Sequence, residues 1–128
     1  MTEFDIVGAD AIQSGRATDA YFDRTATTLE TAGRNPRVVA EVTADQFPTG
    51  SFELFAGLKD ALALLTDRPV DADALPEGTV CDGGPVMRIE GPYLSFARLE
   101  TSLLGFLSHA SAIATAALDC QVAAPDAQ

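Results

Sequence analysis

The stretch Leu103–Ala117, LLGFLSHASAIATAA, decides how the chain is organised. Its apolar residues recur at the three- and four-residue spacing of a helix: Leu103, Phe106, Leu107, Ala110, Ile113, Ala114 and Ala117. This spacing predicts one long helix from about residue 94 to 118. The second half consists largely of Ala and Ser, which either lets another element approach closely or reflects high helix propensity.

The segments that precede this helix alternate between strand and helix patterns. Residues 37–43, RVVAEVT, have the alternation of a half-buried strand, and residues 86–93, VMRIEGPY, predict a second strand that ends at Gly91-Pro92. Between them we expect a turn at 47–50, a short strand in 51–57, a helix over 58–67 and short extended pieces over 68–85. The helix over 58–67 would place Leu58, Leu62 and Leu65 on one face.

The N-terminal part predicts two further helices. Residues 9–14 suggest a short one, and Asp19 is placed to cap a longer one that stops at Gly33, before the turn at Asn35-Pro36. Within the longer helix, Phe22, Ala26 and Leu29 form one apolar stripe, whereas Tyr21 lies roughly 100° away from Phe22.

This order of elements predicts an α+β fold of one domain over residues 1–128. The last helix is among the most apolar parts of the chain, yet no later segment could cover its second half. We therefore expect either a partner on that half or a chain that has been cut short.

Charge and composition exclude some classes of protein. The 128 residues include 19 Asp and Glu against 8 Lys and Arg, a net charge of -11, so a phosphate backbone would be repelled and nucleic acid is a poor partner. Lys59 is the only lysine, and this acidic, lysine-poor composition resembles that of proteins from salt-loving archaea.

The sequence favours a cytoplasmic protein without a membrane segment. The N-terminus lacks the pattern of a signal peptide. No stretch of about 18 apolar residues without a charge is found, so we expect no transmembrane helix. Cys81 and Cys120 form neither a C-x-x-C pair nor a metal spacing, a cytosolic setting argues against a disulfide, and no metal site is expected. His109 has no second metal-ligating residue beside it, and we interpret it as a packing residue. We interpret Asp71 and Asp73 as part of a solvated face.

Six strings in sequence order resemble the N-terminal region of archaeal nicotinate phosphoribosyltransferases. They are TDAYF at 18–22, VAEV at 39–42, FAGL at 55–58, IEGPY at 89–93, LETSLLG at 99–105 and SAIATA at 111–116. Six strings in register over about a hundred residues form a far more specific signal than any one of them.

This resemblance implies an N-terminal α/β domain of the nicotinate/quinolinate phosphoribosyltransferase type, without the (β/α) barrel that follows it in the family. It also implies the family reaction, in which nicotinate and phosphoribosyl diphosphate give nicotinate mononucleotide for NAD synthesis. The full-length family uses Mg²⁺ and often ATP and forms head-to-tail dimers. We expect none of these cofactors on the 128-residue chain alone, which should be inactive.

The resemblance also implies three substrate-binding residues and no catalytic one. Tyr21 of the T-D-x-Y motif would stack on the pyridine ring across the dimer, with Asp19 beside it. Quinolinate-specific relatives have an arginine at the position of Thr101, and a threonine cannot pair with a second carboxylate as arginine does. Thr101 therefore favours nicotinate. Arg88, Arg98 and Glu100 are interface or substrate-orienting candidates.

Two hypotheses of different classes follow. The chain is either the substrate-docking and dimerising part of a nicotinate phosphoribosyltransferase, or a non-catalytic remnant or accessory module that pairs with itself or with an intact copy of the enzyme.

Overall fold

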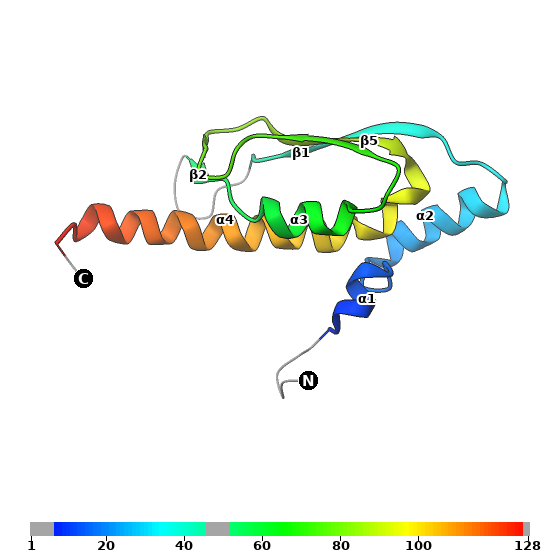
Figure 1. The fold of residues 1–128 in the computed structure, drawn as a ribbon, viewed down its shortest axis with the longest axis horizontal. Coiled ribbons are helices and arrows are strands. Elements are labelled where there is room, and N and C mark those ends of the chain that lie inside the picture. Colours follow the sequence, from blue (N-terminus) through cyan, green and yellow to red (C-terminus); the bar gives the residue numbers. More distant parts are fainter. Residues whose placement is uncertain (1–6, 46–51, 127–128) are drawn as a thin grey trace.

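The computed structural model describes residues 7–45 and 52–126 and confirms the α+β class. Figure 1 shows one layer of strands lying over two helices, with two further helices at one end. The described helices are α1 (Ala9–Gln13), α2 (Ala20–Thr31), α3 (Leu58–Leu65) and α4 (Glu100–Ala123), and the strands are β1 (Arg37–Thr43), β2 (Glu53–Leu54), β3 (Asp71–Ala74), β4 (Val80–Cys81) and β5 (Pro85–Pro92). The turn predicted at 47–50 lies outside the described residues.

The main sheet is antiparallel, in the order β1-β5-β3, and β2 pairs with β4 in a small second sheet. Val38, Ala40 and Val42 of β1 lie opposite Gly91, Ile89 and Met87 of β5, so the inward faces of both strands coincide. This face packs on α3 and α4, where the core gathers Phe55, Leu64, Leu65, Met87, Ile89, Phe96, Leu99, Leu103 and Leu107. The outer face carries ion pairs of Arg37 with Asp71 and Glu90.

Strand β5 ends at Pro92, as predicted, and it includes Gly91 as a paired residue. A side chain at Gly91 would place its Cβ 2.7 Å from Val70 Cγ1 and 2.9 Å from the carbonyl oxygen of Pro69. The glycine is therefore needed because another segment crosses close to the strand, not because the chain turns there.

The long helix differs from its prediction at both ends. Two 3₁₀ turns, η1 (Tyr93–Ser95) and η2 (Ala97–Leu99), precede α4, which then runs to Ala123. Its buried residues are Leu103, Leu107, Ser111 and Thr115, a strict four-residue repeat, whereas Ile113 of the predicted stripe is exposed. The C-terminal end of α4 projects beyond the other elements (Figure 1).

Helix α3 turns part of the predicted face to the core, because Leu58 and Leu65 pack there and Leu62 does not. Ala61, Leu64 and Leu65 are buried, while Leu62 remains 40% exposed. Residues 97–123 are long and apolar enough to cross a membrane by length and composition, which the sequence interpretation did not anticipate. The buried residues of α4 pack within the domain on α3 and β2.

Candidate functional site

Three predicted site residues lie around the point where the beginnings of α2 and α4 meet. The backbone N–H of Asp19 donates a hydrogen bond of 3.1 Å to Thr101 Oγ1, across 82 positions of sequence. Next to it, Ser102 Oγ donates to the carbonyl oxygen of Ala17 at 3.2 Å. We call this region the α2–α4 junction and define it as Asp19, Tyr21, Tyr93, Arg98, Glu100 and Thr101.

Asp19 occupies the N-cap position of α2, as predicted, but its side chain makes no capping hydrogen bond. Its carbonyl oxygen accepts the N–H groups of Phe22 and Asp23, and its N–H is taken by Thr101. The carboxylate of Asp19 is thus not committed to the helix end and can face a ligand. Gly33, with a φ of 64°, follows the last turn as expected of a C-terminal stop.

Tyr21 points away from the core, with 70% of its surface exposed. Its ring meets that of Phe22 edge to face, with centroids 5.2 Å apart and an interplanar angle of 76°. Phe22, Ala26 and Leu29 are turned inward, so the predicted stripe of α2 is confirmed. Because the ring is mostly exposed and contacts Phe22 on one side, it presents a surface suited to a flat aromatic ligand.

Thr101 is poised for one further hydrogen bond. Its oxygen accepts the N–H of Asp19, and within the described residues its hydroxyl hydrogen has no acceptor. A threonine hydroxyl can donate and accept at once, so this group can offer a hydrogen to a carboxylate. A single neutral donor satisfies one carboxylate oxygen but cannot provide the paired charged donors of an arginine.

The electrostatics of the junction are set by a half-buried carboxyl group. Burial raises the pKa of Glu100, and no salt bridge of Glu100 is found in residues 7–45 and 52–126. Burial also raises the pKa of the Tyr93 hydroxyl, and the charges of Glu100 and Tyr21 raise it further. Arg98 is held by Asp23 and Glu30 of α2. Sequence reasoning named Arg98 but missed these two partners, because they lie on another helix.

The remaining predicted groups lie elsewhere. Arg88 pairs with Glu90 on the outer face of the sheet, and His109 is exposed rather than packed. Asp71 pairs with Arg37, while Asp73 is exposed. Among the described residues, no three His, Cys, Asp or Glu side chains are arranged to hold a metal ion.

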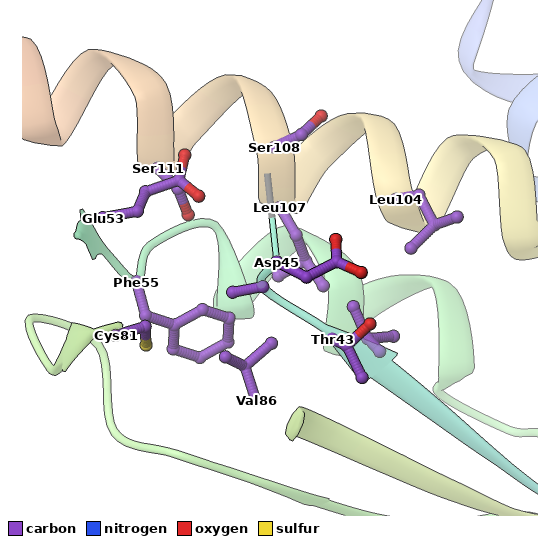
Figure 2. Close-up of a pocket in the computed structure, with 12 residues that line it drawn as sticks. Thr43, Asp45, Glu53, Phe55, Cys81, Val86, Leu104, Leu107, Ser108 and Ser111 are labelled. Carbon is purple, nitrogen blue, oxygen red and sulfur yellow. The ribbon is translucent and has the colours of Figure 1, made fainter. Parts of the chain in front are cut away.

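A cavity of about 460 Å³, which the sequence interpretation missed, lies between α4 and the ends of β1 and β2. Figure 2 shows Leu104, Leu107 and Ser108 of α4 on one side and Phe55 and Val86 opposite them. Its lining includes Asp45 and Glu53, and burial raises the pKa of Glu53. The chain between these two carboxylates includes residues 46–51, outside the described part. None of the predicted site residues lines this cavity, and we place the candidate site at the junction.

The junction lies within the match of this chain to a known family. The model of the quinolinate phosphoribosyl transferase N-terminal domain matches residues 19–111, a range that includes Asp19, Tyr21 and Thr101. The chain belongs to this family of phosphoribosyltransferase domains.

Two solved structures show which proteins the chain is similar to. Nicotinate-nucleotide pyrophosphorylase from Pyrococcus furiosus is 42% identical, with a TM-score of 0.90 over 98% of this chain and 33% of that protein. Human nicotinic acid phosphoribosyltransferase is 27% identical, with a TM-score of 0.77 over 87% of this chain and 29% of that protein. The chain spans about a third of the length of these relatives. Their resemblance confirms the phosphoribosyltransferase type predicted from the sequence.

Proposed function

We propose that this chain is the substrate-docking and dimerising domain of a nicotinate phosphoribosyltransferase, which joins nicotinate to phosphoribosyl diphosphate in NAD synthesis. The observation that carries the proposal is the hydrogen bond from the Asp19 N–H to Thr101, which joins the start of α4 to the residue two positions before the exposed Tyr21. The human relative, which is named for nicotinic acid, supports this choice of substrate. The name of the Pyrococcus furiosus relative refers to the nucleotide, and the family model is named for quinolinate.

In this proposal each residue has a separate task. Tyr21 stacks on the pyridine ring, a contact that adds about 0.5–1.5 kcal/mol beyond burial of area. Thr101 donates its hydroxyl hydrogen to the single carboxylate of nicotinate, and its fixed bond to Asp19 keeps that hydroxyl in place. A second carboxylate would find no charged donor at Thr101, so quinolinate would be the poorer substrate.

The diphosphate leaving group needs metal ions or basic groups, which the junction does not supply. The described residues contain no arrangement suited to Mg²⁺, and Arg98 is already engaged by two carboxylates. Mg²⁺, any ATP and the phosphoribosyl group would therefore be held by the barrel of the family. In a head-to-tail dimer, the barrel that faces this junction belongs to the partner subunit. We place the assembled enzyme in the cytoplasm, and its acidity suits a salt-rich one.

The test is complementation. The 128-residue chain is mixed with the remaining two thirds of the Pyrococcus furiosus relative, and formation of nicotinate mononucleotide is followed by chromatography. We expect turnover only in the mixture, with nicotinate preferred over quinolinate. Turnover on quinolinate alone would contradict the assignment of Thr101.

A Tyr21 pair sharpens this test. Tyr21→Ala should raise the KM for nicotinate about three- to tenfold, which is the loss expected of one stacking contact. Tyr21→Phe keeps an aromatic ring and should leave this KM unchanged. Unchanged KM in Tyr21→Ala would sink the stacking role. Folding is not at issue, because the ring is mostly exposed.

The alternative is a non-catalytic module that pairs with itself or with an intact enzyme. Exposed Ile113 and Val122 on α4 favour association with another surface under either hypothesis. Failure of two well-folded fragments to restore turnover, together with stable association of the chain with an intact relative, would favour the accessory module.

A further inference from the structure

Arg98 joins the start of the long helix to α2 at two points. Its Nε donates to Asp23 Oδ1 at 2.9 Å and its Nη1 donates to Glu30 Oε1 at 2.8 Å. Asp23 and Glu30 lie about two turns apart on the same face of α2. One guanidinium therefore spans most of the length of this helix, a reach that requires its planar fork of donors.

The stem of the Arg98 side chain lies against the loop that precedes α2. Gly15 is buried with a φ of 74°, and a Cβ built there would lie 2.8 Å from Arg98 Cβ. The stem of Arg98 is thus enclosed by the loop before α2, while its head grips the helix itself. The side chain is 29% exposed, less than either carboxylate that it binds.

Helix α2 has few other attachments to the domain. Ala26 is its only fully buried residue, and η2, which contains Arg98, is the element against which it packs most. The hydrogen bond of Asp19 to Thr101 fixes the first residue before the helix but not the direction of its axis. That direction depends on contacts further along α2, which the inward-facing Ala26 and Leu29 and the ion pairs of Arg98 provide together.

We propose that Arg98 is a positioning residue: by holding α2 at Asp23 and Glu30, it fixes the direction in which Tyr21 presents its ring to the pyridine substrate. The proposal rests on the proposed function for its substrate, although its mechanical part concerns this chain alone. Tyr21 lies only two positions before Asp23, so release of Asp23 frees the turn that carries the ring. Both carboxylates are partly exposed, so loss of the two ion pairs should change the global stability only slightly. The informative effect is the change in the position of α2 and of the Tyr21 ring.

The first measurement is amide hydrogen exchange on the 128-residue chain. In Arg98→Met we expect the amides of α2 to exchange roughly tenfold faster while those of α3 keep their rates. Arg98→Lys should give an intermediate result, because a single ammonium cannot engage both carboxylates in the same geometry. Unchanged exchange in α2 would overturn the proposal. If Arg98→Met loses its fold altogether, the double variant Asp23→Ala, Glu30→Ala removes both carboxylate acceptors from the exposed side.

The second measurement uses the complemented enzyme. Arg98→Met should raise the KM for nicotinate by about tenfold with a smaller change in kcat, because a misplaced binding group costs affinity first. If Tyr21→Ala raises KM but Arg98→Met does not, the proposal fails and the proposed function stands. If Tyr21→Ala has no effect on KM, the proposed function of Tyr21 fails, and the exchange rates alone decide whether Arg98 holds α2.

Discussion

The backbone N–H of Leu54 donates a hydrogen bond of 2.8 Å to Thr115 Oγ1, joining residues 61 positions apart. Thr115 in turn donates to the carbonyl oxygen of Ser111, whose own hydroxyl accepts the N–H of Ala56 at 3.0 Å. Ser111 and Thr115 are both buried. The short strand β2 is thus attached to α4 through hydroxyl groups, and this attachment forms one end of the cavity described above.

The loss of that attachment should be measurable. Thr115→Val keeps the shape of the side chain but leaves the N–H of Leu54 without its acceptor, so we expect the free energy of unfolding to fall by about 1–3 kcal/mol. Urea denaturation gives this value. Thr115→Ser keeps the hydroxyl and should lose less. Equal stability of the valine variant and the parent would show that the bond contributes nothing.

Glu100 should make stability depend on pH in an unusual direction. Burial raises its pKa, so the folded chain holds this proton more tightly than the unfolded chain does, and stability is lost as pH rises through that range. We expect Glu100→Gln to raise Tm at neutral pH and to have little effect below about pH 4, where the carboxyl is protonated in both states. Scanning calorimetry at the two pH values checks this.

Glu30 provides the control of opposite sign. The hydrogen bond from Arg98 lowers the pKa of Glu30, so its contribution to stability is present at neutral pH and disappears as pH falls through the lowered value. Glu30→Gln should therefore lower Tm slightly at neutral pH. A rise of Tm in both variants would mean that the net negative charge of the chain, and not burial of Glu100, sets the pH dependence.

Two glycines in or beside helices should respond in opposite ways to alanine. Gly57 has a φ of 91°, and a Cβ there would lie 2.6 Å from the carbonyl oxygen of Phe106. We expect Gly57→Ala to cost about 2 kcal/mol or more. Gly105 lies within α4 with nothing within 4 Å of a built Cβ, so Gly105→Ala should stabilise the chain by up to about 1 kcal/mol. Chemical denaturation of both variants tests the close approach of α3 to α4.

The two thiols should differ in reactivity. Cys81 is buried, and burial together with the nearby charges of Glu53 and Asp82 raises its pKa, whereas Cys120 is exposed. Because the thiolate is the reactive form, a thiol reagent at neutral pH should label Cys120 in the folded chain and Cys81 only after unfolding. Mass spectrometry of the labelled protein identifies the site, and fast labelling of Cys81 in the Cys120→Ser variant would contradict its burial.

Local patterns in the sequence predicted most elements of the fold. The alternation in 37–43 and the stripe of Phe22, Ala26 and Leu29 were confirmed, because both depend on which side chains are apolar. In α4 the error arose because polar side chains are buried. Ser111 and Thr115 occupy the buried seam of α4, and a pattern of apolar residues therefore placed Ile113 there instead.

For the candidate site, the sequence likewise predicted some features and missed others. The T-D-A-Y-F motif and the threonine at position 101 could be found in the sequence, and their membership of a phosphoribosyltransferase domain was predicted correctly. Their contact could not be predicted, because Asp19 and Thr101 are 82 positions apart and neither is marked by periodicity.

The sequence by itself determined the α+β class, the acidic surface and the family, since these depend on composition, local periodicity and short motifs. Only the tertiary structure decided that Thr101 binds the start of α2, that Arg98 holds α2 at two carboxylates and that hydroxyls attach β2 to α4. The physical reason is that each of these contacts satisfies a polar group with a partner distant in sequence, and such pairing is settled only when the apolar core brings the elements together.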